Sequence, residues 1–207
     1  MERRFRLEEQ TLTSKQVDII GEIANISMGN AATTLSMMVN QKVDITTPKV
    51  SIIKRSESLD DYDKTCVIVQ IQYVKGLTGN NVLILKEKDV KVMTDLMMGG
   101  DGSNATGELT ELHLSAASEA MNQMMGKSAT SLSDMLGIPT DISTPVVNTI
   151  DVESVKIFEK MFQTPYERFV KIAFHMTIGT LIDSIMVQLY PVKFAVEMCD
   201  KFSEGNK

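Results

Sequence analysis

Two copies of a Glu-x-x-Asn motif are the residues of this chain best suited to carry chemistry. They are Glu22 with Asn25 and Glu119 with Asn122. On a helix, this spacing places the carboxylate and the amide on one face, about one turn apart. The amide can donate to and accept from a water molecule and so hold it in line with an electrophile, and the carboxylate can pair with a lysine. The pair lacks an electrophile and a metal cluster of its own, so it suits an enzyme whose substrate is a protein that brings both.

Each motif lies on a longer polar stripe with helical spacing. The first stripe reads Asp18, Glu22, Asn25, Gly29, Thr33 and Ser36, and the second reads Ser115, Glu119, Asn122, Gly126, Thr130 and Ser133. A single stripe of this kind is usually a solvated helix face. Asn and Gly, however, cost roughly 0.5 and 1 kcal/mol relative to Ala within a helix. Both residues are kept in both helices, which favours a functional role for the stripes over a merely solvated face. A phosphorylated response regulator, which carries an aspartyl phosphate and Mg²⁺, would be a suitable substrate.

The two motifs belong to an internal repeat. Shifting the sequence by 97 residues aligns 22–48 with 119–145 without a gap, and 13 of these 27 positions are identical. Any surface site on one half is therefore expected to recur on the other.

The elements that must position these residues occur in the same order in both halves. A long helix is predicted to begin after Thr13, with Gln16 completing a capping box, and another after Thr110; they end near Asn40 and Gly137. Extended segments and a closing helix follow in each half, with boundaries predicted at 43–53, 65–74, 82–86 and 89–98, and at 138–150, 168–177, 180–190 and 191–202. Residues 151–164 form an insertion that the pattern leaves unplaced.

This order predicts an α+β fold with pseudo-twofold symmetry, in which both halves contribute to a mainly antiparallel sheet and two long helices carry the sites. We expect a lead-in over 1–13 and a single domain over 14–203. The domain divides into repeat one at about 14–98, a linker at 99–109 and repeat two at about 110–203. The Gly-rich stretch 99–107 lacks the Lys-Ser/Thr of a phosphate loop and the ligand spacing of an EF-hand, so a flexible linker is favoured.

Composition excludes several classes of function. The chain has 207 residues and a net charge of −6, so it lacks the basic face that nucleic acid or an anionic membrane would require. Its apolar runs are too short to insert into a bilayer, and a cytoplasmic protein is expected. Cys66 and Cys199 are predicted to be buried free thiols, His113 and His175 to be structural, and no metal site is expected. Most of the 15 methionines should pack the core, whereas Met28 and Met125 are candidates for a docking surface.

The doubled pattern Asp/Ser-x-x-x-Glu-x-x-Asn, followed after 22 intervening residues by proline, resembles the signature of the CheC/FliY/CheX family of chemotaxis phosphatases. The segments 21–34, 40–48 and 96–102 are most similar to the FliY branch, and the likeness covers roughly residues 14–203. Members of that branch also carry an N-terminal CheY-binding peptide and a C-terminal FliN-like domain, so this chain is expected to correspond to their core.

The resemblance implies a phosphatase that acts on phosphorylated CheY. Asn25 and Asn122 would orient the attacking water, and Glu22 and Glu119 would pair with the active-site lysine of CheY. Residues that match the rest of the signature or its stripe would contribute to CheY docking, namely Asp18, Gly29, Pro48, Ser115, Gly126 and Pro145. No cofactor of its own is implied, because CheY would supply Mg²⁺. The implied location is the cytoplasmic C-ring of the flagellar motor, with FliM-, FliN- and FliG-type partners.

Two other interpretations stay open. One is a non-enzymatic switch-complex scaffold of the same fold, as believed for the middle domain of FliM. The other is a stand-alone CheC-like phosphatase that depends on a CheD-type partner. The two intact Glu-x-x-Asn motifs favour a phosphatase over a scaffold, and the FliY-like segments favour a switch protein over a stand-alone one.

Overall fold

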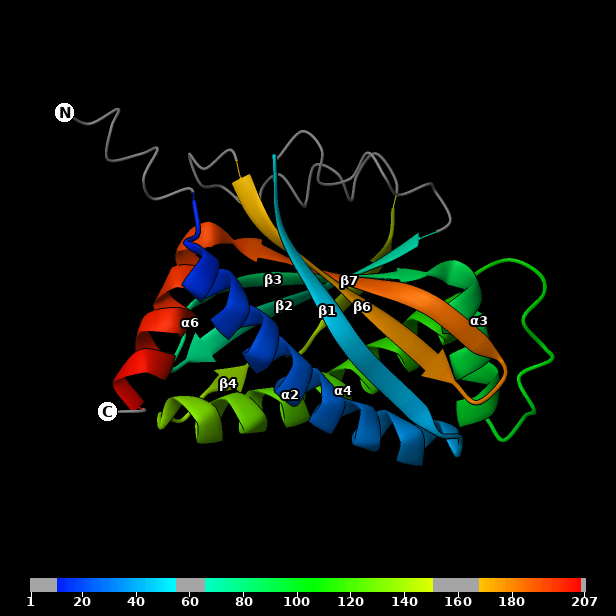
Figure 1. Cartoon of the computed structure of the whole chain (residues 1–207). Helices are drawn as coiled ribbons and strands as arrows, with labels where there is room; N and C mark the ends of the chain where they lie inside the picture. Colours follow the sequence, from blue (N-terminus) through cyan, green and yellow to red (C-terminus); the bar gives the residue numbers. More distant parts are fainter. Residues whose placement is uncertain (1–10, 55–65, 151–167, 206–207) are drawn as a thin grey trace.

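The structure, a computed structural model, describes residues 11–54, 66–150 and 168–205. The unplaced insertion at 151–164 and most of the predicted lead-in lie outside these residues. Two helices of 26 residues each dominate the fold, α2 (Ser14–Val39) and α4 (Glu111–Leu136). They lie side by side and cover one face of a sheet, with α6 (Val192–Gly205) packed near one end of the pair and α3 (Glu87–Met97) near the other (Figure 1).

The limits of the long helices follow from local capping. The Thr13 hydroxyl accepts the Gln16 N–H at 3.2 Å, and the Thr13 N–H donates to Gln16 Oε1 at 2.9 Å, which completes the predicted capping box. In α4, His113 Nδ1 takes the place of the glutamine and accepts the Thr110 N–H at 2.9 Å, so the structural interpretation of His113 is confirmed. Both helices end at a residue with left-handed backbone, Asn40 or Gly137.

Seven strands form one antiparallel sheet in the described residues, which confirms the predicted fold class. The strands are β1 (Val43–Lys54), β2 (Cys66–Lys75), β3 (Gly79–Lys86), β4 (Asp141–Ile142), β5 (Val146–Thr149), β6 (Arg168–Ile178) and β7 (Ile182–Pro191). Their order is β1-β6-β7-β3-β2-β4, and β5 also pairs with β2. The expected extended segment 138–150 is therefore two short strands. β1 and the β4–β5 segment occupy opposite edges of the sheet.

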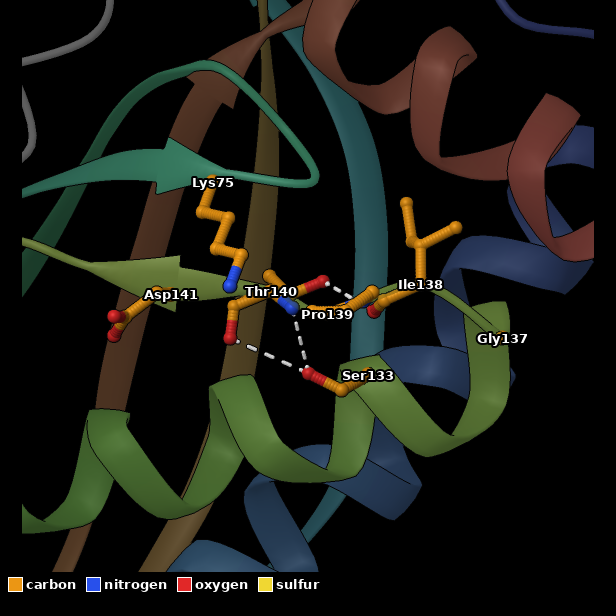
Figure 2. A pocket seen from close by; sticks show the side chains of 7 residues that line it. All are labelled: Lys75, Ser133, Gly137, Ile138, Pro139, Thr140 and Asp141. Atoms are coloured by element: carbon orange, nitrogen blue, oxygen red, sulfur yellow. Dashed lines mark hydrogen bonds between the residues drawn. The ribbon is translucent and has the colours of Figure 1, made fainter.

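A serine at the end of each long helix fixes the chain that follows it. Ser36 Oγ donates to the Ala32 carbonyl and accepts the Val43 N–H, both at 2.9 Å. In the second half, Ser133 Oγ donates to the Ala129 carbonyl at 2.9 Å and accepts the Thr140 N–H at 2.8 Å (Figure 2). The last residue of each predicted polar stripe is thus a structural anchor, because its hydroxyl holds the backbone that leaves the helix.

The connection between the halves is held in place, contrary to the expected flexible linker. Asp95 Oδ2 accepts the Gly102 N–H at 2.7 Å, and Lys91 Nζ donates to the Gly107 carbonyl at 2.5 Å. Gly102 has a φ of +85°, and a Cβ there would come within 2.7 Å of Leu181, so the position needs glycine. Gly102 is thus required by its backbone conformation and by its close contact, whereas Gly99 and Gly107 have positive φ angles with open space around them.

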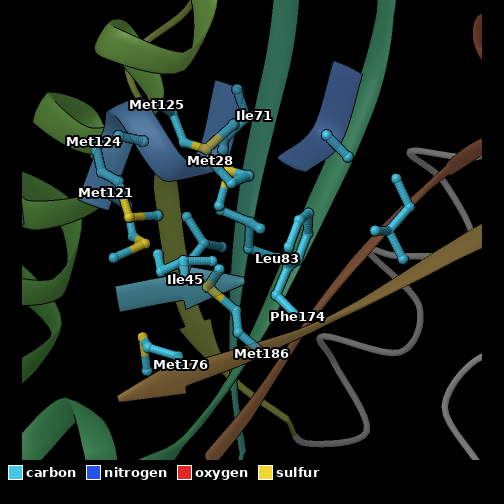
Figure 3. Packing of buried hydrophobic residues seen from close by; sticks show 14 of the residues in the cluster. Met28, Ile45, Ile71, Leu83, Met121, Met124, Met125, Phe174, Met176 and Met186 are labelled. Carbon is cyan, nitrogen blue, oxygen red and sulfur yellow. The ribbon is translucent and has the colours of Figure 1, made fainter. Parts of the chain in front are cut away.

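Methionine side chains fill the space between the two long helices and the sheet. Met28 on α2 and Met121, Met124 and Met125 on α4 are at most 1% exposed, and Figure 3 shows them among Ile71, Ile45 and strand methionines. Unbranched, flexible methionine adapts to the irregular gaps that two packed helices leave above a twisted sheet. Met28 and Met125 are buried, so their predicted role in a docking surface is wrong.

The two thiols are expected to be unreactive in the folded protein. Cys66 and Cys199 are buried thiols that form no disulfide, as predicted, and burial raises the pKa of Cys199 to about 11. At about pH 8, roughly one Cys199 in a thousand would then be thiolate. Titration with a thiol-specific chromogenic disulfide should show slow reaction in the native state and rapid reaction of both thiols after unfolding. Rapid labelling of both thiols in native buffer would contradict this expectation.

Candidate functional site

The structure brings together the central residues of the first predicted site. Glu22 and Asn25 are exposed on α2, where the helix packs against β1. Together with Gly21, Thr46 and Pro48 they line a surface hollow of about 450 Å³. We call this surface face one and define it by Glu22, Asn25, Pro48 and the hollow between them. Within the described part of the chain, neither Glu22 nor Asn25 has a side-chain hydrogen bond or an ion pair, so both are available to a partner.

Pro48 lies at a sheet edge for a physical reason. Proline has no N–H to donate to a ladder and is tolerated at an edge or a bulge. β1 is an edge strand, and its register with β6 shifts between Thr46 and Lys49, which includes Pro48. Pro48 thus lies at an irregularity within a continuous strand, and it forms the wall of the hollow opposite α2.

The second predicted site has the same elements in a different local arrangement. Glu119 is exposed on α4, Asn122 is half-buried, and Pro145 is buried between β4 and β5. The Ser118 hydroxyl donates to the Pro145 carbonyl at 3.2 Å. We call this surface face two and define it by Glu119, Asn122 and Pro145. Because β1 and the β4–β5 segment are at opposite edges of the sheet, the two faces are well separated.

Glu119 differs from Glu22 in its contacts. Gln123 Nε2 donates to Glu119 Oε1 at 2.9 Å, one turn further along α4. The residue at the equivalent position in α2 is Ile26, which cannot make such a bond. The carboxylate of face two is therefore held by a neighbour, although a carboxylate has further lone pairs to offer.

The other predicted binding residues are placed less directly. Asp18 and Ser115 are exposed one turn before the glutamates, and Gly29 and Gly126 are half-buried one turn after the asparagines. None of these four lines the hollow of face one. Gly29 and Gly126 each leave open space where a Cβ would stand, so they are compatible with close approach of a partner.

Gly21 and Thr46 are site-lining residues that the sequence prediction missed. A signal for Gly21 existed, since it directly precedes Glu22 and is one of the repeat positions at which the halves differ, with Ser118 as its counterpart. Thr46 could not be found in this way, because its place beside α2 depends on the packing of β1 against the helix. Its counterpart Ser143 is instead bonded to Gln72 of β2.

A further hollow of about 450 Å³ lies where α4 ends, and contains none of the predicted site residues. It is lined by Lys75, Ser133, Gly137, Ile138, Pro139, Thr140 and Asp141 (Figure 2). Its central hydroxyl, that of Ser133, is already bonded to the backbone, as described above. The hollow offers a lysine and a carboxylate but no group that could act on an electrophile.

Metal and membrane sites were sought in the described residues. No group of three or more His, Cys, Asp or Glu side chains there is arranged to hold a metal ion. His175 Nε2 and Asp183 Oδ1 are 2.6 Å apart on the exposed β6–β7 hairpin, a pairing that sequence spacing had not indicated. None of the described helices is long and apolar enough to cross a membrane.

The chemistry open to each face is limited and specific. An amide on a helix surface can hold a water molecule, and a carboxylate one turn away can bind a cation. Neither face contains a nucleophile with a positioned base. Each face can therefore assist a reaction whose electrophile and leaving group arrive on another molecule.

Comparison with known proteins shows that the chain is similar to a family of phosphatases. The CheC-like family matches residues 16–52 and 112–149, which cover most of α2 and β1, nearly all of α4, and β4 and β5. The chain is 44% identical over 191 residues to the flagellar motor switch phosphatase FliY of Bacillus subtilis, covering 92% of this chain and 50% of that protein. It thus spans about half the length of that relative. The CheY-P phosphatase CheC of the same species is 24% identical over 157 residues, covering 73% and 74% of the two chains.

Solved structures agree with this grouping. The crystal structure of FliY from Thermotoga maritima superimposes with a TM-score of 0.87 at 42% identity, covering 94% of this chain and 98% of that one. The FliM middle domain from H. pylori superimposes with a TM-score of 0.70 at 15% identity, covering 92% and 99%. At that identity the likeness to FliM concerns the fold alone.

Proposed function

Because the chain belongs to the CheC-like family, we propose that it is a hydrolase that removes phosphate from the aspartyl phosphate of CheY. The observation that carries the proposal is the exposed pair Glu22 and Asn25 beside a hollow. The same two residue types recur on α4 as the exposed Glu119 and the half-buried Asn122. The FliY relative at 44% identity is named as a phosphatase, which supports the same activity.

In the proposed mechanism, each asparagine acts on a water molecule. The amide of Asn25 or Asn122 accepts one hydrogen bond from the water and donates another, which aims a lone pair of the water oxygen at phosphorus. Holding the water in line turns a random encounter into a positioned attack, and positioning together with charge stabilisation is the main source of catalysis in phosphoryl transfer. No proton transfer to the amide is required.

The glutamates would act as docking groups. Glu22 or Glu119, one turn before its asparagine, would pair with the active-site lysine of CheY and fix the distance between the helix and the phosphoryl group. Mg²⁺ would be supplied by CheY, because each face offers only a single carboxylate and an amide next to the reacting position.

The same proposal places the protein in the flagellar motor switch. We infer a cytoplasmic location at the C-ring and contacts with FliM-, FliN- and FliG-type proteins, supported by the name of the FliY relative. The greater identity to FliY than to CheC favours a switch protein over a stand-alone phosphatase that needs a CheD-type partner. The scaffold alternative draws on the fold of the FliM middle domain, where only 15% of residues are identical.

An assay of dephosphorylation tests the proposal directly. CheY phosphorylated in the presence of Mg²⁺ should lose phosphate faster when the purified chain is added, in proportion to its concentration. The control is phosphorylated CheY alone at the same Mg²⁺ concentration. A rate that stays at the intrinsic value over a wide range of protein concentration would leave the scaffold role as the function.

A further inference from the structure

The two faces differ most where the repeat changes residue type next to the motif. Position 21 is glycine in α2 and the equivalent position 118 in α4 is serine; position 26 is isoleucine and the equivalent position 123 is glutamine. The motif residues themselves are identical. The differences that a partner would meet therefore lie in these neighbours, in Asp18 and its counterpart Ser115, and in the strands that the helices contact.

The change at the first position gives the two faces different contacts between the helix and its proline segment. Ser118 bonds to the Pro145 carbonyl, so helix α4 and the proline segment are tied together across face two. At face one, Gly21 has no side chain to bridge to Pro48, and the space between them is the hollow. A Cβ on Gly21 would only touch Val50, at 3.8 Å, so nothing in the packing requires glycine there. Glycine at position 21 is therefore not explained by close packing, and its effect is on the shape of the surface beside Pro48.

The change from Ile26 to Gln123 alters the polarity of the surface that a partner would contact. Ile26 is 42% exposed beside Asn25, an apolar side chain at the rim of a polar site. Buried apolar side chains supply much of the energy at the centre of protein interfaces. At face two, Gln123 is polar and bonded to Glu119, so a partner lysine would have to share that carboxylate. Asn25 is also exposed, whereas Asn122 is half-buried.

We propose that face one is the principal docking face for phosphorylated CheY and carries most of the phosphatase activity, with Gly21 and Ile26 as specificity-determining residues. The inference rests on the proposed function and adds to it which face the partner prefers and why. The occupant is a phosphorylated response regulator: its lysine pairs with Glu22, an apolar contact forms at Ile26, and the hollow beside Gly21 admits a protruding part of its surface.

Single asparagine variants separate the two faces. Asn122→Ala leaves only face one, and Asn25→Ala leaves only face two. Face one alone is expected to have a kcat/KM for phosphorylated CheY about fivefold or more above that of face two alone, which corresponds to about 1 kcal/mol of differential binding. The difference should lie mainly in KM, because the water-holding group is the same. Equal values, or a higher value for face two, would overturn the proposal.

Exchange of the neighbouring residues tests their role. In the Asn122→Ala background, Gly21→Ser with Ile26→Gln gives face one the residues of face two, and kcat/KM should fall about fivefold through KM. In the Asn25→Ala background, Ser118→Gly with Gln123→Ile should raise it. Thermal unfolding midpoints close to those of the parent variants would show that folding is intact. Exchanges that leave KM unchanged in properly folded protein would refute the assignment of these residues.

Binding separates failure of this inference from failure of the proposed function. The affinity of phosphorylated CheY for the unmodified chain can be compared with that for Gly21→Ser with Ile26→Gln and for Ser118→Gly with Gln123→Ile, without any hydrolysis being measured. Weaker binding on changing face one supports the inference even if the chain were a scaffold without activity. Binding that is insensitive to face one but lost on changing face two would overturn it.

Discussion

Replacing Asn25 and Asn122 together with alanine is expected to reduce the acceleration of CheY dephosphorylation by about 10²-fold or more, to the intrinsic rate of CheY. The reason is that, in the proposed mechanism, the asparagine amide holds the attacking water by donating to it and accepting from it, and loss of positioning at a reacting centre costs about this much. The measurement is phosphate loss from phosphorylated CheY at saturating protein.

The double substitution should leave the fold intact, so the loss can be assigned to chemistry. Asn25 is exposed, Asn122 is half-buried, and neither has a side-chain hydrogen bond within the described part of the chain. Alanine is the better helix former by roughly 0.5 kcal/mol per site, so the unfolding midpoint should be unchanged or slightly higher. Asn104→Ala makes the same chemical change in the exposed linker and should keep full activity. Undiminished hydrolysis by the double variant would refute the water-positioning mechanism.

Replacing Met28 with alanine is expected to lower the free energy of unfolding by about 2–5 kcal/mol. Met28 is 1% exposed and lies between α2 and α4 above the sheet (Figure 3), so truncation leaves a cavity that its neighbours can fill only in part. Urea unfolding followed by circular dichroism measures the effect, with an unchanged m value showing that the midpoint reports stability.

Met37 provides a matched control on the same helix. Its side chain is 74% exposed, so Met37→Ala should change stability by no more than about 0.5 kcal/mol. The comparison also distinguishes the two roles considered for Met28. If Met28→Ala kept full stability but weakened CheY binding, the docking role would be restored and the core assignment would be wrong.

The helices could be predicted from the sequence because their signals are local. Thr13 and Gln16 are three residues apart, and so are Thr110 and His113; each pair closes a cap by itself. Asn40 and Gly137 end the helices through their own backbone preference. The polar stripes follow from the helical period alone. The placement of each glutamate beside its asparagine therefore needed no knowledge of the rest of the fold.

The surroundings of the motifs depend on contacts between residues far apart in the sequence. Periodicity does not specify that β1 and the β4–β5 segment lie at opposite edges of the sheet, because strand order is decided by which edges pair. Nor does it distinguish Met28, which is buried, from an exposed methionine beside the stripe, since the boundary of a buried face is set by what packs against it. Likewise, Ser36 and Ser133 continue the polar stripes but serve as anchors for the following strands.

The sequence by itself thus determined the repeat, the two long helices, the Glu-x-x-Asn pairs and the family resemblance, all of which arise from spacings of a few residues or from direct self-comparison. Tertiary structure decided that the two faces are unequal. Gly21 lines a hollow beside Pro48 where β1 packs against α2, whereas the Ser118 hydroxyl bonds to the Pro145 carbonyl, 27 residues later in the chain. Such contacts have no local signature, since they form only when a helix and a sheet edge are brought together by folding.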